Sequence, residues 1–173
     1  CESTKVGSGW ANLEGFGDNA IIEGNTCISG DYTGISLYNG TSVARVCNNI
    51  VKDCVTGYGI DTSTMSHVFI DGNYVSNCAN IGIYIYGSSI VSNNIIEDCL
   101  NSGIWTTWTQ NTIESNYIKD TYPPFIRDQG GANSIVGNYM DMGAYPPSSD
   151  VNDGIYLGQG SKASNNYIYV WVT

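Results

Sequence analysis

Aromatic and charged residues that could bind a sugar recur at intervals of about 22 residues. The recurring residues are Asp61, Tyr84, Trp105, Arg127 and Tyr156. A pyranose ring can lay its C–H face on an aromatic ring, while charged groups bind hydroxyls or uronate carboxylates. The pattern predicts a carbohydrate-binding surface if the fold brings these residues together. The simpler interpretation is an aromatic ladder that stabilises a sheet or a contact between subunits.

Carboxylates are the second kind of candidate, because glycoside hydrolysis uses two carboxyl groups about 5–10 Å apart. The candidate pairs in neighbouring repeats are Asp98 with Asp120, Asp120 with Asp141, and Asp128 with Asp150 or Asp153. Asp128 is expected to point inward or to lie at a bend. We take Asp128, Arg127 and Asp120 as the candidate catalytic residues, with Arg127 able to neutralise a uronate. The alternative is that Pro123-Pro124 interrupts the repeat and Asp128 caps the resulting turn.

A calcium site is a further prediction, at the run from Asp150 to Gly154. Asp150 and Asp153 are closely spaced oxygen ligands in this run. The run lacks the twelve-residue pattern and the bidentate glutamate of a complete calcium loop, so a solvated turn is the alternative. No C-x-x-C pair or cysteine–histidine cluster indicates zinc, and no other cofactor is expected.

A repeated motif that ends in asparagine indicates which elements position these residues. Its seven copies are Gly24-Asn25, Asn48-Asn49, Gly72-Asn73, Asn93-Asn94, Ser115-Asn116, Gly137-Asn138 and Asn165-Asn166. The second members are 24, 24, 21, 22, 22 and 28 residues apart. A fixed period of this size is typical of a repeat architecture, in which each repeat is one structural unit.

Three apolar columns, mostly β-branched, surround each asparagine. Three positions before it stand Ile22, Val46, Ile70, Val91, Ile113, Ile135 and Ala163; two after it stand Cys27, Val51, Val75, Ile96, Ile118, Met140 and Ile168. Further on, usually behind a glycine, stand Ile35, Ile60, Ile83, Ile104, Ile126 and Ile155. These columns predict three short strands per repeat, stacked in parallel around a shared core. The asparagine is expected at a bend in a left-handed conformation, with its amide hydrogen-bonded between coils.

The N-x-[IV] and G-I columns resemble the right-handed parallel β-helix of the pectate-lyase-like superfamily. The resemblance implies an all-β fold, a single-stranded right-handed parallel β-helix (β-solenoid) of about seven coils of about 22 residues. This domain would span residues 20–173, with residues 1–19 as an irregular N-terminal segment or a partial coil. The superfamily's N-T-D, G-H-G, R-I-K and R-x-P-x-x-R catalytic blocks do not occur, and His67 is expected on the surface or in a turn.

The six cysteines fall into two groups. Cys54, Cys78 and Cys99 share one position of the repeat and predict a buried column of thiols, with one strained bridge as the alternative. Cys27 is expected to face inward and Cys47 outward. Cys1, Cys27 and Cys47 are the disulfide candidates, within or between chains, and with the fold they favour an extracellular or cell-surface setting. Asn39-Gly40-Thr41 is a glycosylation sequon.

Composition narrows the choice of partners. Charged residues make up 13% of the chain, which has 13 tyrosines and a net charge of −10. An acidic chain without a basic stripe argues against nucleic acid, and no apolar run is long enough to span a membrane. A neutral, tyrosine-rich surface suits contact with sugars or with other subunits.

The C-terminal strand of the last repeat completes the functional hypotheses. The predicted self-association residues are Tyr167, Ile168, Tyr169, Val170 and Trp171, a strong strand former at an open end of the stack. The first hypothesis is therefore an extracellular structural β-helix subunit that forms a homo-oligomer end to end, as a filament, sheath or appendage. The alternatives are a polysaccharide-acting lyase or hydrolase, and a carbohydrate-binding adhesin or tailspike domain.

Overall fold

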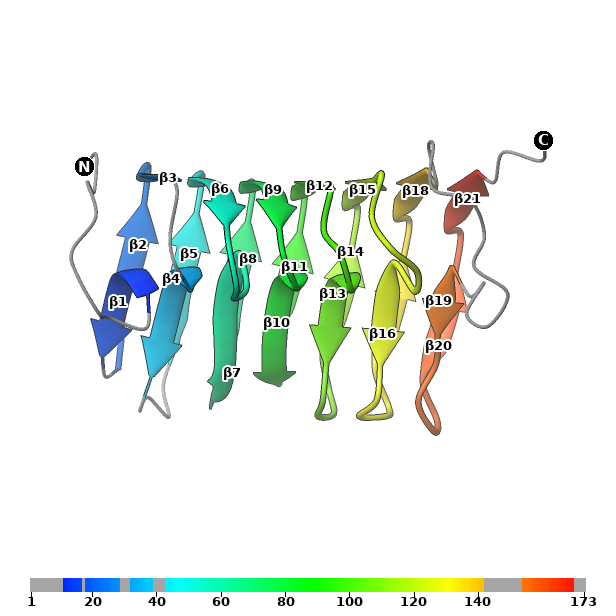
Figure 1. The fold of residues 1–173 in the computed structure, drawn as a ribbon. Helices are drawn as coiled ribbons and strands as arrows, with labels where there is room; N and C mark the ends of the chain where they lie inside the picture. Colours follow the sequence, from blue (N-terminus) through cyan, green and yellow to red (C-terminus); the bar gives the residue numbers. More distant parts are fainter. Residues whose placement is uncertain (1–10, 17, 29–31, 39–42, 142–153, 170–173) are drawn as a thin grey trace.

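Each repeat contributes three short strands, and equivalent strands of successive repeats pair in parallel to form three sheets. The computed structural model describes residues 11–16, 18–28, 32–38, 43–141 and 154–169. Coil follows coil from β1 at one end to β19, β20 and β21 at the other (Figure 1). Within the described ranges each of the three sheets has seven strands, and the predicted all-β parallel solenoid is confirmed.

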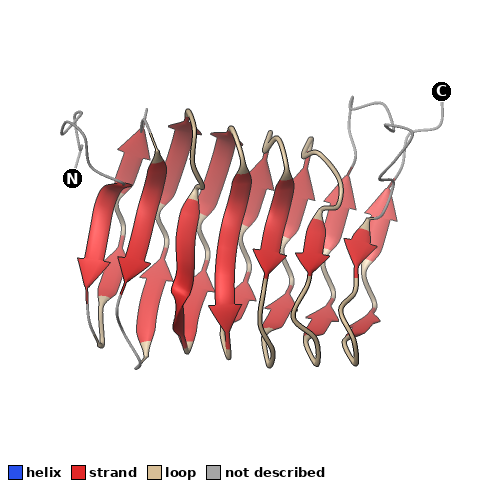
Figure 2. Cartoon of the chain, turned by 60° about the horizontal axis from the view of Figure 1, so that its bottom comes forward, coloured by secondary structure: helices blue, strands red, loops and turns tan. Residues whose placement is uncertain are grey.

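The strands of the three sheets are short, and the chain visits the sheets in turn (Figure 2). Sheet 1 contains β1 (Ala11–Phe16), β4 (Thr33–Tyr38), β7 (Ile60–Ser66), β10 (Ile81–Gly87), β13 (Ser102–Thr106), β16 (Ile126–Asp128) and β19 (Ile155–Tyr156). Sheet 2 contains β2 (Ile21–Glu23), β5 (Ala44–Cys47), β8 (Val68–Asp71), β11 (Ile90–Ser92), β14 (Thr112–Glu114), β17 (Ser134–Val136) and β20 (Lys162–Ser164). Sheet 3 contains β3 (Thr26–Ile28), β6 (Ile50–Cys54), β9 (Tyr74–Cys78), β12 (Ile95–Glu97), β15 (Tyr117–Lys119), β18 (Tyr139–Asp141) and β21 (Tyr167–Tyr169).

The three apolar columns fill the space between the sheets. Ile70 of sheet 2 pairs with its equivalents Val46 and Val91, and the columns of sheets 1 and 3 follow the same register. In the central coils these side chains are fully buried, and they form one continuous core. The predicted columns are therefore confirmed. Strands so short are held in place mainly by this shared core, since one coil cannot bury its apolar side alone.

The corner between sheets 2 and 3 corrects one prediction about the asparagine motif. The left-handed conformation belongs to its first member, as in Asn93 (φ 55°) and Ser115 (φ 55°). The second member turns its amide inward, where it is buried and bonded to the next coil. Asn94 Nδ2, for example, donates to Asn116 Oδ1 at 2.9 Å. The amide ladder was predicted correctly, but on backbone that is not left-handed.

A second ladder lines the corner between sheets 1 and 2. The backbone N–H of Ser89 donates to Asn111 Oδ1 at 3.0 Å, and that of Asn111 donates to Asn133 Oδ1 at 2.7 Å. The residues just before this ladder are left-handed, among them His67 (φ 60°), whose ring is exposed and lies 3.1 Å from Ser66 Oγ. His67 is thus a turn residue on the surface, as predicted.

The cysteines of the described coils are all free thiols. Cys54, Cys78 and Cys99 form the predicted buried column, and Cys27 is buried in the core. Cys47 lies on the outer side of β5, as predicted, but its neighbours leave it only 9% exposed. No bridge therefore joins Cys27 to Cys47 within the chain, and a bridge between chains stays a prediction. Cys1 and the Asn39 sequon lie outside the described residues.

The two ends of the stack refine the predicted domain boundary. Strand β1 lies within the segment expected to be irregular and pairs with β4, for example Leu13 with Ile35. The described part of that segment is thus the partial coil that was the alternative. At the other end, the inward positions of the last coil are less covered: Ala163 is exposed and Ile168 is 42% exposed.

Candidate functional site

The outer side of sheet 1 carries the predicted sugar-binding residues in a single column. Pairing of successive strands places Asp61 beside Tyr84, Tyr84 beside Trp105, and Trp105 beside Arg127. Arg127 in turn pairs with Tyr156. Residues that are up to 29 positions apart in sequence are therefore neighbours in space, at the roughly 4.8 Å spacing of adjacent strands.

Trp105 is the centre of this column. The guanidinium carbon of Arg127 lies 4.5 Å from the centroid of the Trp105 ring, a cation–π contact. On the other side, the Tyr84 ring lies 5.7 Å away at an interplanar angle of 47°. The indole Nε1–H donates to Gln129 Oε1 at 3.2 Å. Trp105 is therefore held from three directions. Because its side chain is already ordered, less conformational entropy is lost when a ligand binds.

Tyr58, which sequence analysis did not identify, packs against the N-terminal half of the column. Tyr58 lies just before β7, and its ring is 5.2 Å from that of Tyr84. Burial raises the pKa of Tyr58, and the nearby Asp61 carboxylate raises it further. Burial likewise raises the pKa of Asp61, although the Ser63 backbone N–H donates to its Oδ1 at 2.8 Å and partly opposes the shift.

We call Tyr58, Asp61, Tyr84, Trp105, Arg127, Gln129 and Tyr156 the aromatic face. It combines half-buried rings with a carboxylate, a guanidinium and an amide, and Tyr156 is its most open ring at 49% exposure. Trp105 has neighbours on both sides of its ring, so stacking space is greatest at Tyr156. The face offers sugar hydroxyls both donors and acceptors along one line.

Asp128 lies on the other side of sheet 1 and is fully buried. Its Oδ1 accepts the Gly130 N–H at 3.1 Å and the Asn133 Nδ2–H at 2.7 Å, whereas its buried Oδ2 has no hydrogen-bond partner. The contact to Gly130 caps the turn that follows β16, and not a turn created by Pro123-Pro124 as in the alternative interpretation. Asp128 and Arg127 do not share a face, so a ligand on the aromatic face contacts only Arg127.

The remaining candidate carboxylates lie near the corner between sheets 3 and 1. Asp98 and Asp120 follow β12 and β15 in left-handed conformations. Burial raises the pKa of Asp98, and the Asp120 carboxylate adds to the rise. Lys119 forms a 3.2 Å ion pair with Asp120. Asp141 lies within β18, where it pairs with Lys119, so Asp120 and Asp141 are not at equivalent positions.

Metal binding has no new support in the structure. Asp150 and Asp153, the calcium candidates, lie outside the described residues. Within the described ranges, no group of three or more His, Cys, Asp or Glu side chains could hold a metal ion. The calcium site stays a prediction.

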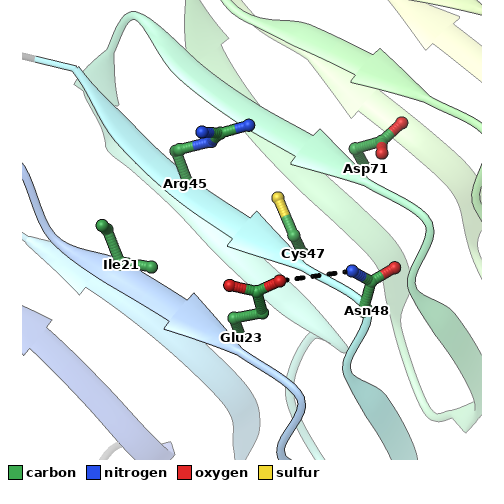
Figure 3. Close-up of a pocket in the computed structure, with 6 residues that line it drawn as sticks. All are labelled: Ile21, Glu23, Arg45, Cys47, Asn48 and Asp71. Atoms are coloured by element: carbon green, nitrogen blue, oxygen red, sulfur yellow. Dashed lines mark hydrogen bonds between the residues drawn. The ribbon is translucent and has the colours of Figure 1, made fainter.

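A pocket of about 190 Å³ opens on the outer side of sheet 2. Figure 3 shows its lining residues, Ile21, Glu23, Arg45, Cys47, Asn48 and Asp71. The carboxylates are already engaged: Glu23 accepts from Asn48 at 3.5 Å, and Asp71 Oδ1 accepts from Ser92 at 2.7 Å and Asn93 at 2.8 Å. The pocket therefore adds no candidate chemistry to that of the aromatic face.

Sheet 3 carries a second outward stripe that sequence analysis missed. It consists of Ile50, Tyr74, Ile95, Tyr117, Tyr139 and Tyr167. Each of these residues directly follows an anchor asparagine, so the variable position of the N-x-[IV] motif was the signal that could have revealed the stripe.

The comparisons with known proteins agree with this architecture. The family model described as "Right handed beta helix region" matches residues 11–170. No curated protein and no solved structure matches the chain. Among the described residues, no helix is long and apolar enough to cross a membrane.

Proposed function

The chain belongs to the right-handed β-helix family, and from this premise we propose that it binds an extended glycan along the aromatic face. The observation that carries the proposal is the unbroken column from Asp61 through Trp105 to Tyr156. Because neighbouring coils are about 4.8 Å apart, a linear ligand aligned with the solenoid meets one of these side chains per coil. The family by itself does not specify this function, because function resides in sites that a fold carries.

The polar groups on the face support the same assignment. Arg127 and Gln129 both contact Trp105, so an amide and a guanidinium are held beside the ring. Sugar recognition needs such groups next to an aromatic surface, since hydroxyls require partners when they leave water. Glycan contact outside the cell also agrees with the proposed extracellular or cell-surface location.

The experiment is retention of the purified protein on immobilised neutral and acidic polysaccharides. We expect binding to at least one of them, and Tyr156→Ala, which removes the most open ring of the aromatic face, to weaken it about tenfold or more. Phe69→Ala, which removes a 39% exposed ring from the outer side of sheet 2, is the matched control and should bind normally. Equal retention of both variants, or no retention of the unmodified chain, would overturn the proposal. New reducing or unsaturated ends would instead support the lyase or hydrolase hypothesis.

A second candidate function is self-association end to end, as in a filament, sheath or appendage. The observation in its favour is the exposure of Ile168 in the last coil, flanked by Tyr167 (54% exposed) and Tyr169 (38% exposed). Val170 and Trp171 lie outside the described residues. Light scattering across a range of concentrations tests this candidate: open-ended growth that Ile168→Asp abolishes supports it, and a monomer at every concentration contradicts it.

A further inference from the structure

The outer side of sheet 3 presents an apolar stripe that continues over six strands. The stripe is Ile50, Tyr74, Ile95, Tyr117, Tyr139 and Tyr167, one residue per coil from β6 to β21. Several of these side chains are well exposed, including Ile50 at 40%, Ile95 at 42% and Tyr167 at 54%. Six neighbouring strands extend about 24 Å along the solenoid. A continuous exposed apolar stripe of this length indicates an interaction surface.

The geometry of the rings shows which kind of partner suits the stripe. The rings of Tyr117 and Tyr139 stack at 5.1 Å with an angle of 10°, and those of Tyr139 and Tyr167 at 5.0 Å with an angle of 17°. Their faces therefore cover one another, and the surface offers ring edges and hydroxyls. Sugars stack on open ring faces, whereas protein interfaces are rich in such packed tyrosines. The stripe thus suits a protein surface better than a glycan.

A polar column runs beside the stripe and carries alternating charges. Its members, from β6 to β18, are Lys52, Ser76, Glu97, Lys119 and Asp141. These groups are anchored by local contacts. Tyr74 Oη donates to Glu97 Oε2 at 2.9 Å, and Lys52 Nζ lies 4.8 Å from the centroid of the Tyr74 ring. Lys119 forms the ion pair with Asp120.

We propose that a second copy of this chain packs antiparallel on sheet 3, about a two-fold axis that passes between β12 and β15. In such an isologous contact each column faces itself in reverse order. Glu97 of one copy then faces Lys119 of the other, and the reverse pair forms at the same time. Since Glu97 and Lys119 are also neighbours within one chain, the four charges alternate around the axis.

The same axis gives the apolar stripe a complete set of partners. Ile95 faces Tyr117 of the other copy, Tyr74 faces Tyr139, and Ile50 faces Tyr167. Every contact then joins an aromatic ring to an aliphatic side chain or to another ring, and no charge is placed on the stripe.

Other positions of the axis bring like charges together or shorten the contact. An axis through β12 sets Glu97 against its own copy, and one through β15 sets Lys119 against itself and Glu97 against Asp141. An axis between β9 and β12 sets Lys52 against Lys119. An axis between β15 and β18 pairs Lys119 with Asp141 but leaves the first two strands of the stripe, β6 and β9, uncovered. Charge pattern and overlap therefore select a single register.

The stripe is narrow, so the interface would bury a small surface area for a specific protein–protein contact. We therefore expect weak, concentration-dependent dimers. Sedimentation equilibrium of the whole chain over a wide concentration range measures them. E97K or K119E should weaken dimerisation about tenfold or more, because each places like charges at the axis. The charge-swapped double variant E97K/K119E should return to within about threefold of the original. Glu114→Lys, on sheet 2, makes the same charge change elsewhere and should leave dimerisation unaltered.

Circular dichroism of each variant confirms that the coils remain folded. A chain that stays monomeric at all concentrations would overturn the proposal, as would a double variant no better than the single ones. Dimerisation through sheet 3 can also be distinguished from end-to-end association. An antiparallel contact stops at the dimer, whereas stacking of the ends continues to larger species.

Discussion

The side-chain amide of Asn116 donates to Oδ1 of Asn138 at 2.9 Å, and the same Oδ1 accepts the Asn116 backbone N–H at 2.9 Å. From Asn49 to Asn166 each amide also bonds to the coil before it; Asn116 Nδ2, for example, donates to the Val91 carbonyl at 2.9 Å. The contact is repeated between all seven anchor asparagines, from Asn25 to Asn166. Buried polar groups that are fully partnered specify one register, because a shift by one residue would leave them unpaired.

The ladder predicts a large stability loss when a central member is removed. Asn94→Ala would leave the Asn73 backbone N–H without its acceptor and the Ile70 carbonyl without the Asn94 amide. Since each buried group left unpaired costs about 1–3 kcal/mol, we expect the free energy of unfolding to fall by about 3 kcal/mol. Urea denaturation followed by circular dichroism measures the change.

The neighbouring residue of the same motif provides the control. Asn93 is exposed and left-handed (φ 55°), so Asn93→Gly keeps the backbone unstrained and removes only an exposed bond to Asp71. We expect a change within about 0.5 kcal/mol. Equal effects of the two substitutions would show that the buried ladder has no special role.

Much of this fold could be predicted from the sequence because the repeat sets the register. Once the asparagines are aligned, the partner of every inward residue follows, and Val46, Ile70 and Val91 are in contact as expected. The backbone at the corner was harder to predict. Both residues of a pair such as Asn93-Asn94 tolerate a left-handed conformation, and only the need to bury one amide decides that the first adopts it.

The interior glycines predict a steric limit on the corner between sheets 3 and 1. A Cβ on Gly82 would lie 2.5 Å from Ile96 Cγ2 and 2.7 Å from the Gly103 carbonyl oxygen. Because backbone and core must both move, we expect Gly82→Ala to lower the free energy of unfolding by about 2 kcal/mol or more.

Gly24→Ala is the contrasting case. Nothing lies within 4 Å of a Cβ on Gly24, and only the left-handed backbone (φ +67°) opposes the substitution. Its expected cost is about 1 kcal/mol. A Gly82 variant no less stable than the Gly24 variant would contradict the steric argument.

Asp128 predicts opposite outcomes for two substitutions. Asp128→Leu removes the acceptor of the Gly130 and Asn133 donors, so we expect a loss of about 2 kcal/mol or more. Asp128→Asn keeps one carbonyl oxygen for both donors and removes a buried carboxylate. The urea concentration at the midpoint of unfolding should therefore be at least as high as that of the original chain. Should the asparagine variant be as unstable as the leucine variant, the charge itself would be what the turn requires.

The candidate site was predictable as a column but not as a set of contacts. Register alone places Tyr84, Trp105 and Arg127 side by side. The cation–π contact depends on the rotamer of Arg127, and Tyr58 enters from a corner of variable length that carries no repeat signal. Neighbouring positions follow from the period, whereas side-chain conformations depend on packing that only the folded structure defines.

Asp61 predicts a pH dependence whose sign follows from its environment. Its pKa is raised in the folded chain by burial, against the opposing Ser63 bonds, so folding favours the protonated carboxyl. The resulting stability is fully present below the unfolded pKa of 3.8 and is lost as pH rises through the folded pKa. Asp61→Asn keeps an acceptor for the Ser63 N–H and cannot ionise. We therefore expect the variant to be more stable than the original near pH 7, with the difference shrinking on acidification.

Urea titrations between about pH 3 and pH 7 measure this difference in stability, with Glu114→Gln on sheet 2 as the control for loss of one exposed charge. A difference that stays constant over this range, or that grows in acid, would contradict the assigned direction.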